Sequence, residues 1–152
     1  MSQETATVQT EQVTDLENSK DEKKTFKTLP LRSINDIIRD LHKPIHPKHL
    51  KTRRQGGKEI TYIAWYDSAK YLDLYAPGWS HEIRSIQQIA GKVVITVRIS
   101  VPTAEGITYR EATGSEDEDM DSYGDAFSNS ESMALRRCAA KFGLGQHLYR
   151  DK

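Results

Sequence analysis

Apolar and polar residues alternate most regularly over residues 92–101. The apolar positions are Val93, Ile95, Val97, Ile99 and Val101. This period of two predicts a β-strand with one buried face. The turn-forming segments "AGK" (90–92) and "TAEG" (103–106) lie at its two ends. With further strands predicted near 80–89 and 107–113, this part of the chain is expected to form a three-stranded antiparallel meander.

Each predicted strand carries one arginine at a polar position, and these are Arg84, Arg98 and Arg110. One interpretation is that all three share a face of the sheet and make it basic. A solvated face balanced by Glu82 or Glu111 is an equal alternative. The register of the strands decides between the two, and the sequence alone does not give register.

Two segments before the meander have apolar residues at helical spacing. The first stripe consists of Ile34, Ile37, Ile38 and Leu41, and the second of Trp65, Ala69, Leu72 and Ala76. Ser33 is the candidate N-cap of the first helix, with Asp36 three residues later, and Pro44 prevents its continuation. Between the helices, "EITYIAW" (59–65) has the β-branched and aromatic residues of a short strand.

Aromatic residues cluster around the second helix. They are Trp65, Tyr66, Tyr71, Tyr75 and Trp79. Such a cluster can stack nucleobases, but aromatic side chains more commonly pack in a core, and core packing is the expectation here.

A last helix is predicted from about Asp125 to Phe142. Its apolar stripe consists of Leu135, Cys138, Ala139 and Phe142. Gly143 suits the left-handed residue that ends many helices, and Leu144 suits the apolar contact that follows. Cys138 is therefore predicted to be a small core residue rather than a nucleophile.

The same helix carries three basic residues. Arg137 and Lys141 are i, i+4 neighbours on the side away from the apolar stripe, with Arg136 one position round. The small Ala140 between them is expected to leave room for an elongated ligand.

A second basic segment, "HPKHLKTRRQGGKE" (46–59), is predicted to be a loop that closes on Gly56 and Gly57. Its basic residues are Lys48, Lys51, Arg53, Arg54 and Lys58. An ordinary hairpin-like connection is the alternative interpretation.

Charge is unevenly distributed along the 152 residues, although 22 basic and 22 acidic residues balance overall. Residues 1–24 hold six acidic and three basic residues and no aromatic residue, which predicts a disordered acidic tail before a single domain over 25–152. The remaining 19 basic and 16 acidic residues give a net charge of +3. Five of those acids lie in "EDEDMD" (116–121), so the rest of the domain carries +8, enough for a polyanion-binding face.

No apolar run approaches the length of a membrane span, and the first residues lack the zones of a secretory signal. A transit peptide would be rich in arginine and poor in acids, unlike residues 1–24. We therefore expect a cytoplasmic or nucleoid protein of phage, plasmid or bacterial origin that is neither secreted nor bound to a membrane.

Spacing also argues against several catalytic and metal-binding motifs. Lys58 follows Gly57 as in a Walker loop, but Thr52 and Glu59 stand where that motif needs Gly and Ser or Thr. "DEDMD" (117–121) resembles the start of a calcium loop without the Gly and Glu that such a loop requires, so a solvated acidic loop is predicted. The histidines are His42, His46, His49, His81 and His147, and the first three lie in a proline-broken segment without a nearby cysteine. We expect no enzymatic activity, no cofactor and no metal.

Three segments stand out in order and spacing, namely "GGKEITYIAWYDSAKYLDLYAPGW" (56–79), "YREATG" (109–114) and "SMALRRCAAKFGLGQHLY" (132–149). On these residues the chain resembles the Rad52 family of single-strand annealing proteins. The resemblance covers roughly residues 31–149. It implies an α+β fold with a helix, a strand, a second helix, a three-stranded antiparallel meander and a long C-terminal helix, assembled into a homo-oligomeric ring.

The resemblance also implies a groove that holds single-stranded DNA by its backbone, with the bases outward. Arg136 and Arg137 match the family's basic pair on the groove helix, and Arg53 or Arg54 matches its arginine near the glycine loop. Ala140 replaces a further basic residue. The predicted DNA-binding residues are Lys51, Arg53, Arg54, Lys58, Arg136, Arg137 and Lys141.

The expected function is therefore ATP-independent binding and annealing of single strands in recombination and repair, with recombination or replication proteins as further partners. Two other classes stay open. One is a protein that binds double-stranded or structured nucleic acid, and the other is a scaffold whose basic face docks acidic proteins. A nuclease that uses the acidic run is a more distant alternative.

Overall fold

The computed structural model describes residues 30–119 and 125–150, so the predicted acidic tail and the last two residues of the acidic run, 120–121, lie outside the described residues. The elements are α2 (Ile34–Leu41), the 3-10 helix η1 (Pro47–His49), β1 (Leu50–Gln55), β2 (Lys58–Ile63), α3 (Trp65–Tyr75), β3 (Ser80–Ile89), β4 (Lys92–Thr103), β5 (Gly106–Asp117), α4 (Ala126–Lys141) and α5 (His147–Arg150). This is the predicted α+β fold. None of the helices in these ranges is long and apolar enough to cross a membrane.

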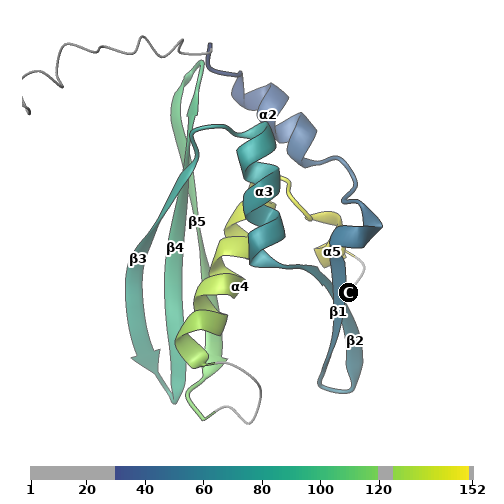
Figure 1. The fold of residues 1–152 in the computed structure, drawn as a ribbon. Coiled ribbons are helices and arrows are strands. Elements are labelled where there is room, and N and C mark those ends of the chain that lie inside the picture. The colour runs from purple at the N-terminus through teal and green to yellow at the C-terminus, as the bar shows by residue number, and fades with distance from the viewer. Residues whose placement is uncertain (1–29, 120–124, 151–152) are drawn as a thin grey trace, which may run out of the picture. The chain divides into compact units, whose positions relative to one another are not determined.

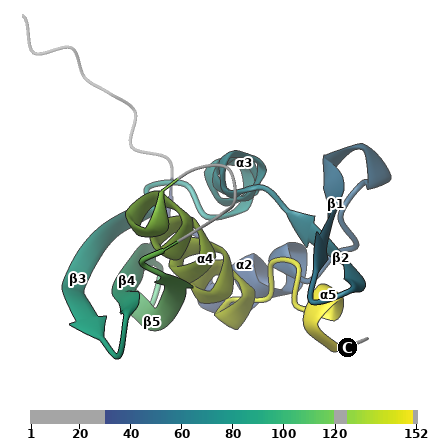
Figure 2. The same cartoon turned by 90° about the horizontal axis from the view of Figure 1, so that it is seen from below.

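The core lies between α4 and an antiparallel sheet of order β3-β4-β5 and extends to residues of α2, β2 and α3 (Figure 1). Alternate residues of β4 are buried from Val93 to Val101, as the sequence pattern predicts, because α4 covers that face. The hairpin of β1 and β2 lies on the other side of α4 from the sheet, which the second view also shows (Figure 2). Helix α4 is therefore the central element.

Helix α4 approaches β5 closely at Gly114. A Cβ atom on Gly114 would lie 2.2 Å from the carbonyl oxygen of Ser130 and 2.6 Å from the amide nitrogen of Ala134. Ser130 and Ala134 are fully buried, and the Ser130 hydroxyl donates to the carbonyl of Val93 at 3.1 Å. Three small residues thus set the distance and rotation of α4 on the sheet.

The predicted limits of α4 are confirmed. Asp125 is the N-cap, and its carboxylate accepts from the amide of Ser128 at 2.8 Å. At the other end Gly143 has φ +117°, and the amides of Gly143 and Leu144 donate to carbonyls of the last helical turn. A side chain at Gly143 would also collide with the His42 ring, at 2.3 Å from Nδ1. The apolar stripe of α4, including Cys138, is buried as predicted.

The basic segment predicted as a loop contains a strand. Residues Leu50–Gln55 form β1, which pairs with β2 in register, so that Gln55 faces Lys58 and Lys51 faces Tyr62. Gly56 and Gly57 both have positive φ, as a two-residue hairpin turn requires. Because both faces of β1 are exposed, its sequence lacks the alternation that predicts a strand.

The three sheet arginines do not share a face. Arg98 donates to Glu111, with its Nη2 atom 2.7 Å from the carboxylate, and Arg84 contacts Glu82 and Glu111 on the same face. Arg110 pairs with Ile99 in register and donates to the carbonyl of Lys141, on the helix side. The balanced face was the correct alternative, because the register separates Arg110 from the other two.

The expectation that the aromatic cluster packs in the core is correct for three residues and wrong for two. Tyr71, Tyr75 and Trp79 are partly buried against the core. Trp65 and Tyr66 are 50% and 42% exposed. Leu72 and Ala76 of the predicted stripe are buried together with Asp67 and Ser68, so this side of α3 faces the core, but Trp65 at the first position of the helix is exposed.

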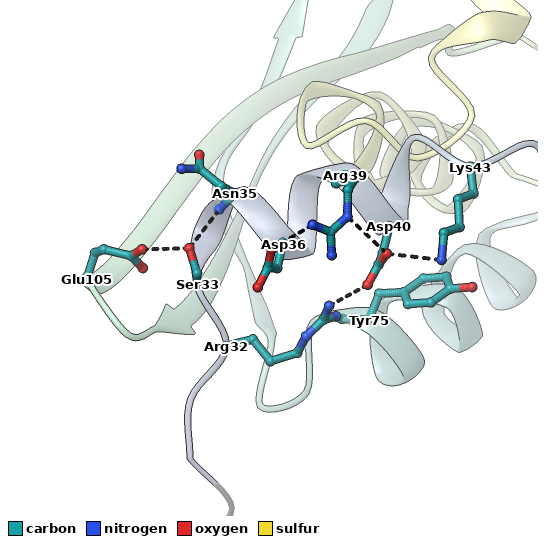
Figure 3. A network of polar contacts seen from close by, with 9 residues as sticks. All are labelled: Arg32, Ser33, Asn35, Asp36, Arg39, Asp40, Lys43, Tyr75 and Glu105. Carbon is teal, nitrogen blue, oxygen red and sulfur yellow. Dashed lines mark hydrogen bonds and ion pairs between the residues drawn. The ribbon is translucent and has the colours of Figure 1, made fainter.

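Helix α2 is held by polar contacts at both ends (Figure 3). The Ser33 hydroxyl caps the helix as predicted, and Glu105, from the β4–β5 turn, accepts from the Ser33 hydroxyl at 2.7 Å and from the Ile34 amide at 3.1 Å. Asp36, three residues after Ser33, pairs with Arg39 at 2.9 Å. Glu105, which is distant in sequence, therefore supplies the carboxylate that accepts from the first amide of α2.

At the other end of α2, the Asp40 carboxylate forms ion pairs with Arg32 and with Lys43, whose Nζ lies 3.1 Å away. Arg32 also donates to the carbonyl of Tyr75 at 2.7 Å, which ties α2 to α3. Hydrogen bonds from Arg32 and Lys43 hold the pKa of Asp40 below its ordinary value.

We expect Asp40→Asn to lower the free energy of unfolding at neutral pH and to matter less in acid. A carboxylate whose pKa is lower in the folded state stabilises the fold above its unfolded pKa, and this contribution is lost as pH falls through the folded pKa. Urea denaturation of both proteins between pH 7 and pH 3 measures the difference. A difference in unfolding free energy between the two proteins that stays constant across this range would contradict the ion-pair role. Asp36→Asn, which removes an exposed carboxylate, serves as the control.

Candidate nucleic-acid interface

An open groove of about 540 Å³ lies between the β1–β2 hairpin and α4. The hairpin contributes Arg53 and Tyr62, α4 contributes Arg136 and Arg137, and α5 contributes Tyr149. A second hollow continues the groove and shares Arg53, Tyr62 and Arg136 with it. We call the two together the hairpin groove.

The Tyr62 ring lies near two guanidinium groups from different elements. The Arg53 guanidinium carbon lies 5.2 Å from the ring centroid, and that of Arg136 lies 5.1 Å from it. Such cation–π contacts attract both cations to the ring. The Arg136 Nε also donates to the carbonyl of Ser132 at 3.2 Å, which fixes the side chain along α4.

The surroundings of Arg136 disfavour the charged form of its guanidinium group. Burial and, to a smaller extent, the nearby Arg53 lower the pKa of Arg136. Burial likewise raises the pKa of Tyr149, on the same groove wall. An anion between Arg53 and Arg136 would relieve their repulsion and supply a countercharge.

The side chains of Arg137 and Lys141 contact the backbone of β5 and not the Tyr62 ring. The Arg137 Nη1 donates to the carbonyl of Thr113 at 3.2 Å, and the Lys141 Nζ donates to the carbonyl of Glu111 at 2.5 Å. These bonds orient the side chains without neutralising their charge. Ala140, predicted to leave room for a ligand, is only 7% exposed and so provides no surface space.

The remaining predicted residues lie on the exposed hairpin. Lys51 and Arg54 line the second hollow, whereas Lys58 lies at the hairpin turn and lines neither hollow. The Lys51 Nζ lies 4.7 Å from the centroid of the Tyr66 ring, and a hydrogen bond with the Tyr66 hydroxyl raises the pKa of Lys51. The structure thus brings together Lys51, Arg53, Arg54, Arg136 and Arg137, while Lys58 and Lys141 lie outside the hollows.

None of the seven predicted basic residues forms an ion pair within the described part of the chain. The ion pairs there involve other cations, namely Arg32, Arg39, Lys43, Lys70, Arg84, Lys92 and Arg98. Glu116 is the acidic residue that lines both hollows, and Asp117 lies beside it. Apart from this acidic end, the hairpin groove carries a concentration of uncompensated positive charge.

Tyr62, Met133, Tyr149, Trp65 and Tyr66 also line the hairpin groove and were missed as site residues. For Tyr62 a signal existed: a two-residue turn at Gly56 and Gly57 sets the register that places Tyr62 diagonally opposite Arg53. Its approach to Arg136 depends on the packing of α4 and has no local signal.

The three candidate zinc histidines of residues 42–49 have separate hydrogen-bond partners. His42 contacts the carbonyl of Ile38 at 2.8 Å, His46 accepts from the amide of Lys48 at 3.2 Å, and His49 contacts the Tyr71 hydroxyl at 2.8 Å. The described residues contain no cluster of His, Cys, Asp or Glu that could hold a metal ion.

The described residues therefore define an α+β protein with a cationic groove between a hairpin and its central helix, the kind of site that binds a polyanion. Residues 33–152 match the model of the Rad52/22 family of double-strand break repair proteins, and the chain belongs to this family.

Two relatives from Arabidopsis thaliana are similar over most of the chain. The first, named DNA repair RAD52-like protein 1, mitochondrial, is 35% identical over 122 residues, which are 79% of this chain and 69% of the relative. The second, DNA repair RAD52-like protein 2, chloroplastic, is 32% identical over 124 residues, 79% of this chain and 62% of the relative. Both names place the relatives in organelles, whereas the expectation of a cytoplasmic or nucleoid protein rests on residues 1–24 and stays a prediction.

We expect Arg136→Met to leave the free energy of unfolding unchanged or to raise it. The substitution removes a half-buried charge that lacks a described carboxylate partner and keeps the apolar stem. Arg98→Met is the matched control and should lower stability, because it breaks the contact with Glu111. Urea titrations measure both, and a clear loss of stability in Arg136→Met would show that the residue serves the fold.

Proposed function

We propose that this chain binds single-stranded DNA along the hairpin groove through the sugar-phosphate backbone and anneals complementary strands without ATP. The observation that carries this proposal is the convergence of Arg53 and Arg136 on Tyr62 with no described carboxylate in an ion pair with either. Membership of the Rad52/22 family supports a role of this binding in repair of double-strand breaks by recombination.

The physics of annealing suits a cationic groove. Two complementary strands are polyanions, and lysine and arginine contacts to phosphates release counterions and lower their repulsion without reading sequence. Contacts confined to the backbone leave the base edges free to pair. The reaction needs no covalent chemistry, so positioning and charge are sufficient.

In this proposal the basic residues have different roles. Arg53 and Arg136 bind phosphates inside the groove, where both guanidinium groups lie near the Tyr62 ring. Arg137 and Lys141, held by β5 carbonyls, extend the track along α4, and Lys51, Arg54 and Lys58 extend it over the hairpin. Glu116 and Asp117 repel DNA at one end and so limit the path.

We also propose that the protein works as a homo-oligomer, in accord with the ring that the family resemblance implies. Among the described strands, β3 pairs only with β4, and its other edge is open over ten residues. Ile83, Ile86 and Ile89 on this strand are exposed. A long open edge with exposed isoleucines is a surface that natural proteins usually cover by association.

We expect Arg137→Ala to weaken binding to single strands of any sequence and to make the dependence of log K on log salt shallower by about 0.7 for each phosphate that the variant no longer neutralises. Fluorescence anisotropy with a labelled oligonucleotide, repeated over a salt series, gives both quantities. Arg84→Ala removes the same charge from the ion-paired outer face of the sheet and should leave the slope unchanged. Equal slopes for Arg137→Ala and wild type would count against the proposed track.

The proposal as a whole is tested by mixing two complementary labelled oligonucleotides with the protein and no nucleotide. We expect faster duplex formation than without protein and reduced acceleration by Arg136→Ala. Preferential binding of a preformed duplex in competition would favour the structured nucleic-acid alternative. Absence of nucleic-acid binding at physiological salt would favour a scaffold, and magnesium-dependent cleavage a nuclease.

A further inference from the structure

Two exposed aromatic side chains stand at one end of the hairpin groove without a role in the core. Trp65 and Tyr66 are the first two residues of α3 and line the second hollow together with Lys51 and Arg54. Their ring centroids are 5.8 Å apart and the rings are nearly perpendicular. Large aromatic surfaces of this kind are usually buried or in contact with a ligand.

Trp65 also borders a separate cleft of about 320 Å³ between α3, α4 and the start of β3. Trp79 and His81 line this cleft and stack on each other with ring centroids 5.7 Å apart. Its volume lies within the usual range of ligand pockets, about 300–1,000 Å³. A planar group of a ligand that projects from the hairpin groove beside Trp65 would therefore also contact the aromatic rings that line this cleft.

Cations flank the aromatic pair on the groove side. The Lys51 Nζ lies 4.7 Å from the Tyr66 ring centroid and contacts the Tyr66 hydroxyl, and Arg54 lines the same hollow. A positive group next to an exposed aromatic face matches a nucleotide, which joins an anionic phosphate to a flat base. An apolar protein segment would leave these cations without a counterion.

We propose that Trp65 and Tyr66 hold one nucleobase of the strand whose phosphates lie in the hairpin groove, so that each protomer clamps a single base. This inference rests on the proposed function, because it assumes that single-stranded DNA occupies the groove. The base stacks on the exposed face of Trp65, and Lys51 binds the adjoining phosphate. Stacking of this kind tolerates any base, because every base has a π-face.

A clamp for one base is compatible with annealing. The phosphate track leaves the other bases exposed for pairing, while the clamped base fixes the position of the strand in the groove. Tyr109 is another large exposed aromatic residue, and it lies 4.1 Å from the guanidinium carbon of Arg98, which is ion-paired with Glu111. Tyr109 is therefore a matched control that has the same chemistry without an uncompensated cation.

The test compares oligo(dT) with a strand of the same length built of abasic residues, which keeps the phosphates and removes the bases. We expect Trp65→Ala to weaken binding of oligo(dT) by about fivefold or more, the equivalent of about 1 kcal/mol or more per stacked base, and to leave the abasic strand unaffected. Tyr109→Ala should change neither affinity. Arg136→Ala should weaken both strands.

A second measurement uses fluorescence. The chain contains two tryptophans, so Trp79→Phe leaves Trp65 as the only indole. We expect oligo(dT) to quench its emission and the abasic strand to quench it far less, because stacking requires the base. Equal quenching by both strands would overturn the clamp.

Other outcomes separate the clamp from the proposed function. Equal losses of affinity for both strands in Trp65→Ala, or a change in its oligomer size by light scattering, would overturn the clamp and assign Trp65 to the fold or to subunit contact. In another outcome, wild type binds both strands, Arg136→Ala abolishes this binding and Trp65→Ala leaves it unchanged. That result would support the phosphate track and contradict the clamp. Failure of wild type to bind either strand would overturn the proposed function itself.

Discussion

The arrangement of the described residues depends on the close contact of α4 with the sheet at Gly114. Because no side chain fits between β5 and the backbone at Ser130 and Ala134, α4 has one rotation about its axis. That rotation buries the stripe that includes Leu135 and Cys138. It also directs Arg136 toward the hairpin and Arg137 toward the edge of β5, so one packing contact sets the direction of both cations.

The distribution of ion pairs divides the basic residues into those that pair with carboxylates in the fold and those whose charge can bind a ligand. On the outer face of the sheet and around α2, basic residues are matched with Glu111 and Asp40. At the hairpin groove, Arg53 and Arg136 are attracted to an aromatic ring and not to a carboxylate. A half-buried cation without a described counterion is unfavourable for the fold alone, and it suits a surface whose counterions arrive with an anionic ligand.

The same groove combines electrostatic and aromatic surface. The hairpin supplies exposed cations, α4 supplies constrained ones, and the first turn of α3 adds Trp65 and Tyr66. Both aromatic residues are exposed at the start of α3, whereas Ser68, Leu72 and Ala76 further along the chain are buried. Sequence periodicity predicted the helix, its length and the burial of Leu72 and Ala76, but not the exposure of Trp65, since spacing alone does not show where a helix end extends past its neighbours.

The sequence by itself determined the elements whose burial follows a local period, namely β4 with its alternating apolar residues, and α4 with its stripe and glycine end. It also singled out Arg53 and Arg136 as basic residues and showed a balanced charge for the whole chain. Only the tertiary structure decided that β1 is a strand, that Glu105 caps α2, and that Arg53 and Arg136 meet on Tyr62. The reason is physical: periodicity reports the environment of one element, whereas the pairing of charges depends on contacts between segments far apart in the chain.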